Sequence, residues 1–153
     1  MAFSANQAAP FFLVAVAAWL VTVGRPGVVN RTSDPLVKEL DRLSPPDGAN
    51  TFEPCTYRTK GDDNRLYSCL YRASLSYADL TSAYEKQLLA NGWRRYGEVR
   101  LYDWGRDLGG KEAFYCKGDL QISLQFSGER STLAWRYALD ASVGVPPHYC
   151  SGR

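Results

Sequence analysis

The chain has 153 residues, a formal net charge of +2 and 22% charged residues. This length accommodates one domain with an ordinary core and a short appendage. Electrostatic nucleic-acid binders usually carry a strongly basic face, so we expect no nucleic-acid partner. Aromatic residues make up 13% of the chain, which favours a packed sheet over disorder.

The N-terminal part carries one strongly apolar run, AAPFFLVAVAAWLVTVG, at residues 8–24. As an α-helix it would be about 25 Å long, slightly short of a bilayer's hydrocarbon core of about 30 Å. We expect a tail at 1–9 and a single transmembrane helix at 10–29, with residues 10–24 contacting membrane lipid. The alternative is a cleaved signal sequence, although the first nine residues lack the Lys or Arg of a signal-peptide n-region.

A short helix and a linker are expected to follow at residues 30–54. In SDPLVKELDRL, Ser33 or Asp34 can cap a helix and Pro35 suits its first turn. Three leucines recur at helical spacing, and SPPDGANTFEP (44–54) has the composition of a linker. The folded domain is then expected at 55–153.

The segment CTYRTKGDDNRLYSC (55–69) is symmetric about a Gly-Asp-Asp turn. Counting inward pairs Cys55 with Cys69, and Tyr57 with Tyr67. Facing Cα atoms in an antiparallel pair lie about 4.5–5.5 Å apart, within the range of about 4.4–6.8 Å that disulfides require. We predict a hairpin closed by a Cys55–Cys69 disulfide, which stabilises the fold by about 3 kcal/mol if chain entropy dominates. The alternative is a facing pair of reduced core thiols.

The remaining cysteines, Cys116 and Cys150, are left to pair with each other. The sequence does not fix the face of Cys116, because a two-residue and a three-residue turn at 117–119 give opposite parities. No C-x-x-C pair is present, and the single His148 does not complete a zinc set at finger-like spacing. A four-cysteine zinc site is the alternative to two disulfides, but we expect no metal.

Two disulfides predict an oxidising compartment, and therefore a periplasmic domain outside the cytoplasmic face of a bilayer. The cations that follow the apolar run, among them Arg25, Arg31 and Lys38, favour the opposite orientation under the positive-inside rule. That rule is a bias, and a domain of this length can translocate despite it. We therefore give the cysteines more weight.

The segment SYADLTSAYEKQLLANGW (76–93) has the strongest helix pattern in the chain. Ser76 and Asp79 form a capping box, and Gly92 suits the left-handed residue that ends a helix. Leu80, Tyr84 and Leu88 recur at i, i+4 and i+8. These three side chains should therefore form the face that packs on the core.

The pattern Tyr84-x-x-x-Leu88 followed by Gly92-Trp93 resembles small exported bacterial domains, many of them lipoproteins of unknown function. In those domains a helix ending in Gly-Trp precedes antiparallel strands. The resemblance covers residues 76–93 and implies an α+β fold and an extracytoplasmic location, but no activity. This chain lacks the lipidated cysteine expected after a lipoprotein signal.

The rest of the chain is strand-like. WRRYGEVRLYDWG (93–105) is followed by a predicted Gly-rich turn, RDLGG (106–110), and the next two strands form a hairpin about Gly118. In STLAWRYALDASV (131–143), the expected apolar set is Leu133, Trp135, Tyr137 and Leu139. We predict an α+β sandwich of two layers, with one main helix on a twisted antiparallel sheet of about five to six strands.

A group of aromatic and arginine side chains in the strand after the helix is the best candidate for a binding surface. By alternation these residues share one face with Glu98, while Trp93, Val99 and Leu101 lie on the opposite, core-facing side. Aromatic residues and arginine are enriched in protein interfaces. The alternative is cross-strand pairing on a solvated face, and acidic neighbours argue against nucleic-acid stacking. The predicted partner-binding residues are Arg94, Tyr96, Arg100, Tyr102 and Trp104.

No catalytic motif stands out. His148 lies alone in a proline-flanked tail, and Asp62-Asp63 suit turn geometry better than catalysis. We expect no enzymatic activity and no cofactor. The predicted function is a membrane-anchored extracytoplasmic protein-interaction module, an accessory or structural subunit of a larger membrane complex. The alternatives are a secreted or periplasmic domain that binds a small ligand or envelope polymer, and an enzyme whose carboxylates only the fold brings together.

Overall fold

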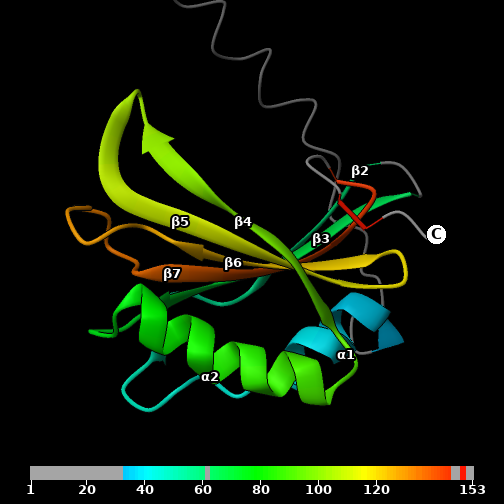
Figure 1. Ribbon diagram of the computed structural model, residues 1–153. Coiled ribbons are helices and arrows are strands. Elements are labelled where there is room, and N and C mark those ends of the chain that lie inside the picture. The colour runs from blue at the N-terminus through cyan, green and yellow to red at the C-terminus, as the bar shows by residue number, and fades with distance from the viewer. Residues whose placement is uncertain (1–32, 61–62, 146–148, 151–153) are drawn as a thin grey trace, which may run out of the picture.

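The computed structural model describes residues 33–60, 63–145 and 149–150 (Figure 1). Its strands form one seven-stranded antiparallel sheet in the order β1-β3-β7-β6-β5-β4, and β2 also pairs with β3. This confirms the α+β class, and the sheet has more strands than expected because a two-residue strand in the predicted linker joins it. The elements are α1 (Pro35–Asp41), β1 (Asn50–Thr51), β2 (Thr56–Lys60), β3 (Asn64–Arg72), α2 (Tyr77–Ala90), β4 (Arg94–Asp103), β5 (Arg106–Lys117), β6 (Leu120–Phe126) and β7 (Tyr137–Val143).

Both helices lie on the same face of the sheet, below it in Figure 1. Helix α2 buries the predicted Leu80, Tyr84 and Leu88, and Ser76 caps it by accepting a hydrogen bond from the Asp79 N–H. Alternate residues of the central strands complete the core, including the fully buried Leu124 of β6. Helix α1 contributes its leucines to the same cluster, so the segment before residue 55 is part of the folded unit.

Tyrosine side chains link α2 to the centre of the sheet. The hydroxyls of Tyr84 and Tyr137 lie 2.9 Å apart and hydrogen-bond to each other. The ring of Tyr137 stacks on Tyr71 of the neighbouring strand at a centroid distance of 4.7 Å. Burial raises the pKa of Tyr84 and that of Tyr137, the latter to about 12, so both hydroxyls stay neutral.

The first hairpin has the predicted register. Tyr57 faces Tyr67, and Cys55 and Cys69 form a disulfide with Cα atoms 4.3 Å apart. Because this disulfide lies on the helix side of the sheet, it closes the hairpin against the core.

The second disulfide joins Cys116 and Cys150, with Cα atoms 5.3 Å apart. Lys117 pairs with Leu120, so the β5–β6 turn has two residues and its Gly118 has a φ of 60°. This parity places Cys116 opposite Gln121, on the face away from the helices.

Two local expectations are wrong. The Gly-rich segment 106–110 is the start of β5, and the turn lies earlier, at Trp104-Gly105, with Asp103 paired to Arg106. The last strand begins at Tyr137, so Leu133 lies outside the apolar strand face and is 57% exposed. In both places, pairing with the neighbouring strand sets the ends of the strand, and glycine content or alternation within one segment did not predict them.

The predicted transmembrane helix at 10–29 lies outside the described residues, as do Asp62 and His148. Among the helices of the described ranges, none combines the length and the apolar character needed to cross a bilayer.

Asp34 joins α1 to the first hairpin. Its Oδ1 accepts the Leu36 N–H at 2.8 Å, while its Oδ2 accepts the Tyr57 hydroxyl at 2.6 Å and the Arg65 guanidinium at 3.0 Å. Burial alone would raise the pKa of Asp34, but these three donors outweigh it and hold the pKa below its ordinary value. One carboxylate therefore both caps a helix and fixes its position on the sheet.

We predict that Asp34→Ala lowers the free energy of unfolding by about 2 kcal/mol at pH 7, because the cap and two side-chain partners are lost together. Since the folded pKa is lowered, the contribution is complete above the ordinary carboxyl pKa and disappears as pH falls through the folded value. The free energies of unfolding of the wild type and the variant should therefore converge as pH falls, which urea unfolding of both proteins at several acid pH values measures. Asp41→Ala, at an exposed carboxylate of the same helix, is the control and should change little. An equal loss in both variants would contradict the assignment.

Candidate functional site

The β4–β5 hairpin and the loop beside it carry most of the exposed hydrophobic surface of the described residues. Strand β4 is a sheet edge that pairs only with β5, and the hairpin bends away from α2 (Figure 1). Leu89 of α2 is the one large exposed hydrophobic residue of the described ranges outside this region. The others are Tyr96, Val99, Tyr102, Trp104 and Leu133.

Trp104 forms the tip of the hairpin. It is 96% exposed and has a φ of 50°, while the following Gly105 has a φ of 80°. Two-residue hairpin turns with positive φ at both positions favour Asn-Gly, and a bulky residue there is an outlier. Trp104 is the only non-glycine residue of the described ranges with positive φ. Neither turn geometry nor burial accounts for a tryptophan at this position.

The five predicted partner-binding residues lie on one hairpin but not on one face. A bulge between Arg95 and Gly97 shifts the alternation, so Glu98 and Arg100 pair with Ala113 and Lys111 on the helix side. There Glu98 accepts hydrogen bonds from Tyr77 of α2 and from Arg95, each at 2.8 Å. The shared-face prediction is therefore wrong.

The opposite side of β4 carries Arg94, which pairs with Cys116, and Val99 and Leu101. Of the expected core residues, Trp93 is buried, whereas Val99 is 39% exposed. Tyr96 lies in the bulge, and its ring stacks on Tyr149 at a centroid distance of 5.1 Å.

A pocket of about 290 Å³ lies beside the hairpin. Tyr102 and Leu133 contribute exposed apolar surface to it, and Arg106 and Arg130 contribute charge. Arg130 lies 3.9 Å from the Asp107 carboxylate, and Arg106 pairs with Asp103. A concave surface lined by apolar side chains and by arginines paired with Asp103 and Asp107 therefore adjoins the hairpin tip.

The described C-terminal segment, residues 149–150, covers one end of the sheet face opposite the helices. The Cys116–Cys150 disulfide holds it there, and the Tyr149 N–H donates to Gln121 Oε1 at 2.8 Å. The ring of Tyr149 packs edge-on against Phe114 at 4.6 Å. This disulfide thus orders an aromatic cluster that the sequence pattern did not reveal.

Two carboxyl groups lie on a part of the same face that none of the described elements covers. Asp140 of β7 stands in register between Ser68 of β3 and Ser123 of β6, while Glu112 of β5 is in the adjoining row. Asp140 is hydrogen-bonded to Ser68, and Glu112 to Ser123. The only sequence signal was a polar residue at alternate positions of strands whose other face is apolar.

Both carboxyls are electrostatically uncompensated. Desolvation raises the pKa of Asp140, and its Oδ1 is out of contact with solvent and has no hydrogen-bond partner among the described residues. Desolvation also raises the pKa of Glu112, and repulsion from Asp140 adds to it. Within the described ranges, no ion pair involves either group.

The described residues contain no cluster of three or more His, Cys, Asp or Glu side chains that could hold a metal ion. Comparison of the chain with protein-family models, with curated proteins and with solved structures gives no match. The hairpin surface and the two carboxyls are therefore the candidate functional features of the described residues.

We predict that Asp140→Asn raises the free energy of unfolding at pH 7 by about 1 kcal/mol, because it removes a charge that the fold leaves unsatisfied. An acid whose folded pKa is raised favours the folded state most below its unfolded pKa, and this advantage is lost as pH rises through the folded value. The gain of the variant should therefore vanish in acid. Thermal unfolding of both proteins from acid to neutral pH tests this, and a destabilised variant at pH 7 would refute it.

Proposed function

We propose that this protein is a membrane-anchored extracytoplasmic interaction module that serves as an accessory or structural subunit of a membrane protein complex. The folded domain presents the tip of the β4–β5 hairpin to a protein partner. The observation that carries this proposal is Trp104, fully exposed in a turn position that disfavours it.

A tryptophan at positive φ raises the free energy of the folded state without contributing contacts to it. Residues held in sparsely populated backbone regions concentrate at sites of function, and exposed tryptophan is enriched among interface hot spots. The neighbouring Tyr102 and Leu133 extend the apolar surface, and the adjoining pocket can receive a partner side chain. Arginine at the rim then adds polar contacts, as is typical of interface anatomy.

The compartment and the anchor complete the proposal. Two disulfides in the described domain are compatible with an oxidising environment. The apolar run at 8–24 supports anchoring in a bilayer ahead of residue 33, where the described domain begins. A tethered domain finds a partner in the same membrane at a raised effective concentration, so a modest surface can suffice.

We predict that Trp104→Asn weakens the complex roughly thirtyfold, the loss of about 2 kcal/mol expected for a hot-spot residue. Asparagine suits the turn, so the same variant should be more stable by about 1 kcal/mol. Tagged full-length protein is extracted from native membranes in mild detergent, and the co-eluting chain is quantified by size-exclusion chromatography and mass spectrometry. Leu89→Ala, at an exposed leucine on α2, is the matched control and should retain the partner. A monomeric wild type, or equal recovery with Trp104→Asn, would refute the proposal.

The anchor and compartment have their own test. Full-length protein should remain in the membrane pellet after carbonate extraction, begin upstream of residue 10 by N-terminal sequencing, and contain no free thiols by mass spectrometry without reduction. These results follow from an uncleaved anchor and two disulfides formed beyond the cytoplasm. A mature start after residue 18 would indicate a cleaved signal, and four free thiols would place the domain in a reducing compartment.

A further inference from the structure

We propose that the sheet face opposite the helices binds an organic cation, a primary ammonium group on an alkyl stem, at the carboxyls of Glu112 and Asp140. This site is separate from the hairpin tip and does not depend on the interaction proposed there.

Charge is the first argument. The two carboxyls interact repulsively, and their hydrogen-bond partners on the sheet are the neutral hydroxyls of Ser68 and Ser123. No described cation pairs with either group, and Asp140 Oδ1 has no described donor. A ligand ammonium supplies the missing positive charge and three N–H donors.

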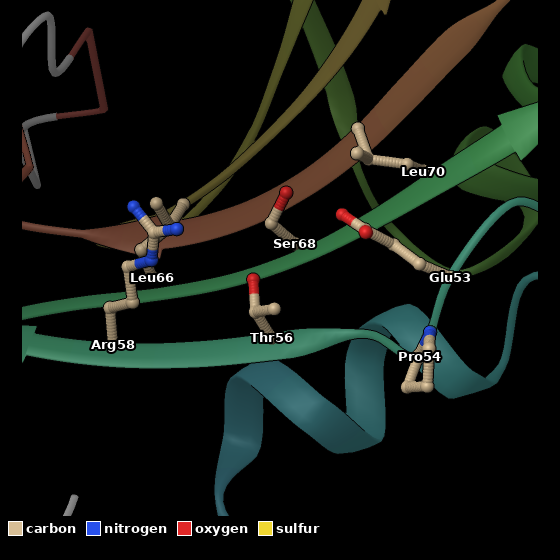
Figure 2. Close-up of a pocket in the computed structure, with 7 residues that line it drawn as sticks. All are labelled: Glu53, Pro54, Thr56, Arg58, Leu66, Ser68 and Leu70. Atoms are coloured by element: carbon tan, nitrogen blue, oxygen red, sulfur yellow. The ribbon is translucent and has the colours of Figure 1, made fainter. Parts of the chain in front are cut away.

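Shape is the second argument. A depression of about 140 Å³ lies over β2 and β3, directly beside Asp140, because Ser68 both lines it and hydrogen-bonds to that carboxyl. Figure 2 shows the hydroxyls of Thr56 and Ser68 in its centre, with the side chain of Leu70 alongside and the carboxylate of Glu53 directed toward Ser68. The cationic side chain of Arg58 also lines the depression, but it pairs with Leu66, four residues along β3 from Leu70. An alkyl stem that starts from an ammonium at Asp140 can lie along Leu70 in this depression.

The donor set favours an ammonium over a divalent metal ion. Calcium takes six to eight oxygen ligands and magnesium demands near-octahedral geometry, whereas the described residues bring two carboxyls together here and no larger acidic cluster. It also favours a cation over a neutral alcohol, since an alcohol leaves the repulsion between the carboxyls uncompensated.

The test uses purified full-length protein and n-pentylammonium as the probe, followed by calorimetry and by NMR shifts. We expect saturable binding of the ammonium and no measurable binding of n-pentanol, its neutral counterpart. Asp140→Asn and Glu112→Gln should each weaken binding about tenfold or more, the loss expected for a charge-assisted hydrogen bond. The exposed Asp47→Asn is the matched control. Unfolding curves of each variant verify that the fold is retained.

Further arms distinguish the source of the cation and separate this site from the hairpin. Tighter binding of a blocked lysine amide than of pentylammonium supports a lysine side chain of a protein, and the reverse order supports a free amine. Trp104→Asn should leave ammonium binding unchanged, whatever it does to the complex. The proposal is overturned if pentanol binds as well as the ammonium, if both carboxyl variants bind normally, or if calcium binds and the ammonium does not.

Discussion

The packing of α2 on the sheet through Tyr84 and Tyr137 decides what each face of the sheet can do. This packing places one set of alternating residues of β3, β5, β6 and β7 in the core. There the hydroxyls of Tyr84 and Tyr137 hydrogen-bond to each other, and the flanking side chains are apolar. Since side chains alternate along a strand, the intervening set must point away from the helices. Glu112 and Asp140 belong to that second set, which neither α1 nor α2 covers (Figure 1).

The two disulfides reinforce opposite sides of this arrangement. Cys55–Cys69 lies on the helix side and closes the first hairpin, next to the position where Asp34 ties α1 to Tyr57 and Arg65. Cys116–Cys150 lies on the other side and holds Cys150 and the neighbouring Tyr149 against β5. A cross-link that closes a long loop restricts the unfolded chain more than one that closes a short loop. The second disulfide therefore supplies the larger entropic constraint, while the first fixes local register.

The sequence was informative wherever a pattern is local. The symmetric spacing of Cys55 and Cys69 predicted the hairpin register, and the capping box with its leucine and tyrosine stripe predicted α2. It failed at the bulge near Gly97, because a bulge depends on pairing with β5 and reverses the alternation that single-strand reasoning assumes. It also misplaced the turn, since residue preferences point to the glycines at 109–110 and away from a tryptophan at positive φ.

Glu112 and Asp140 are 28 positions apart in sequence, and only the strand order of the sheet brings them near each other.

The anchored residues Tyr149 and Cys150 bound the sheet face that carries Glu112 and Asp140, on the side away from the hairpin tip. Tyr149 lies between Tyr96 of β4 and Phe114 of β5, so it fills the end of the open face near Cys116. Phe114 occupies the same register row as Ser123 and Asp140, so Tyr149 packs beside the row in which the polar part of that face begins. The side-chain oxygen of Gln121 accepts the Tyr149 N–H, while Ser123, two residues along β6, hydrogen-bonds to Glu112. Strand β6 thus positions both Tyr149 and the carboxyl of Glu112.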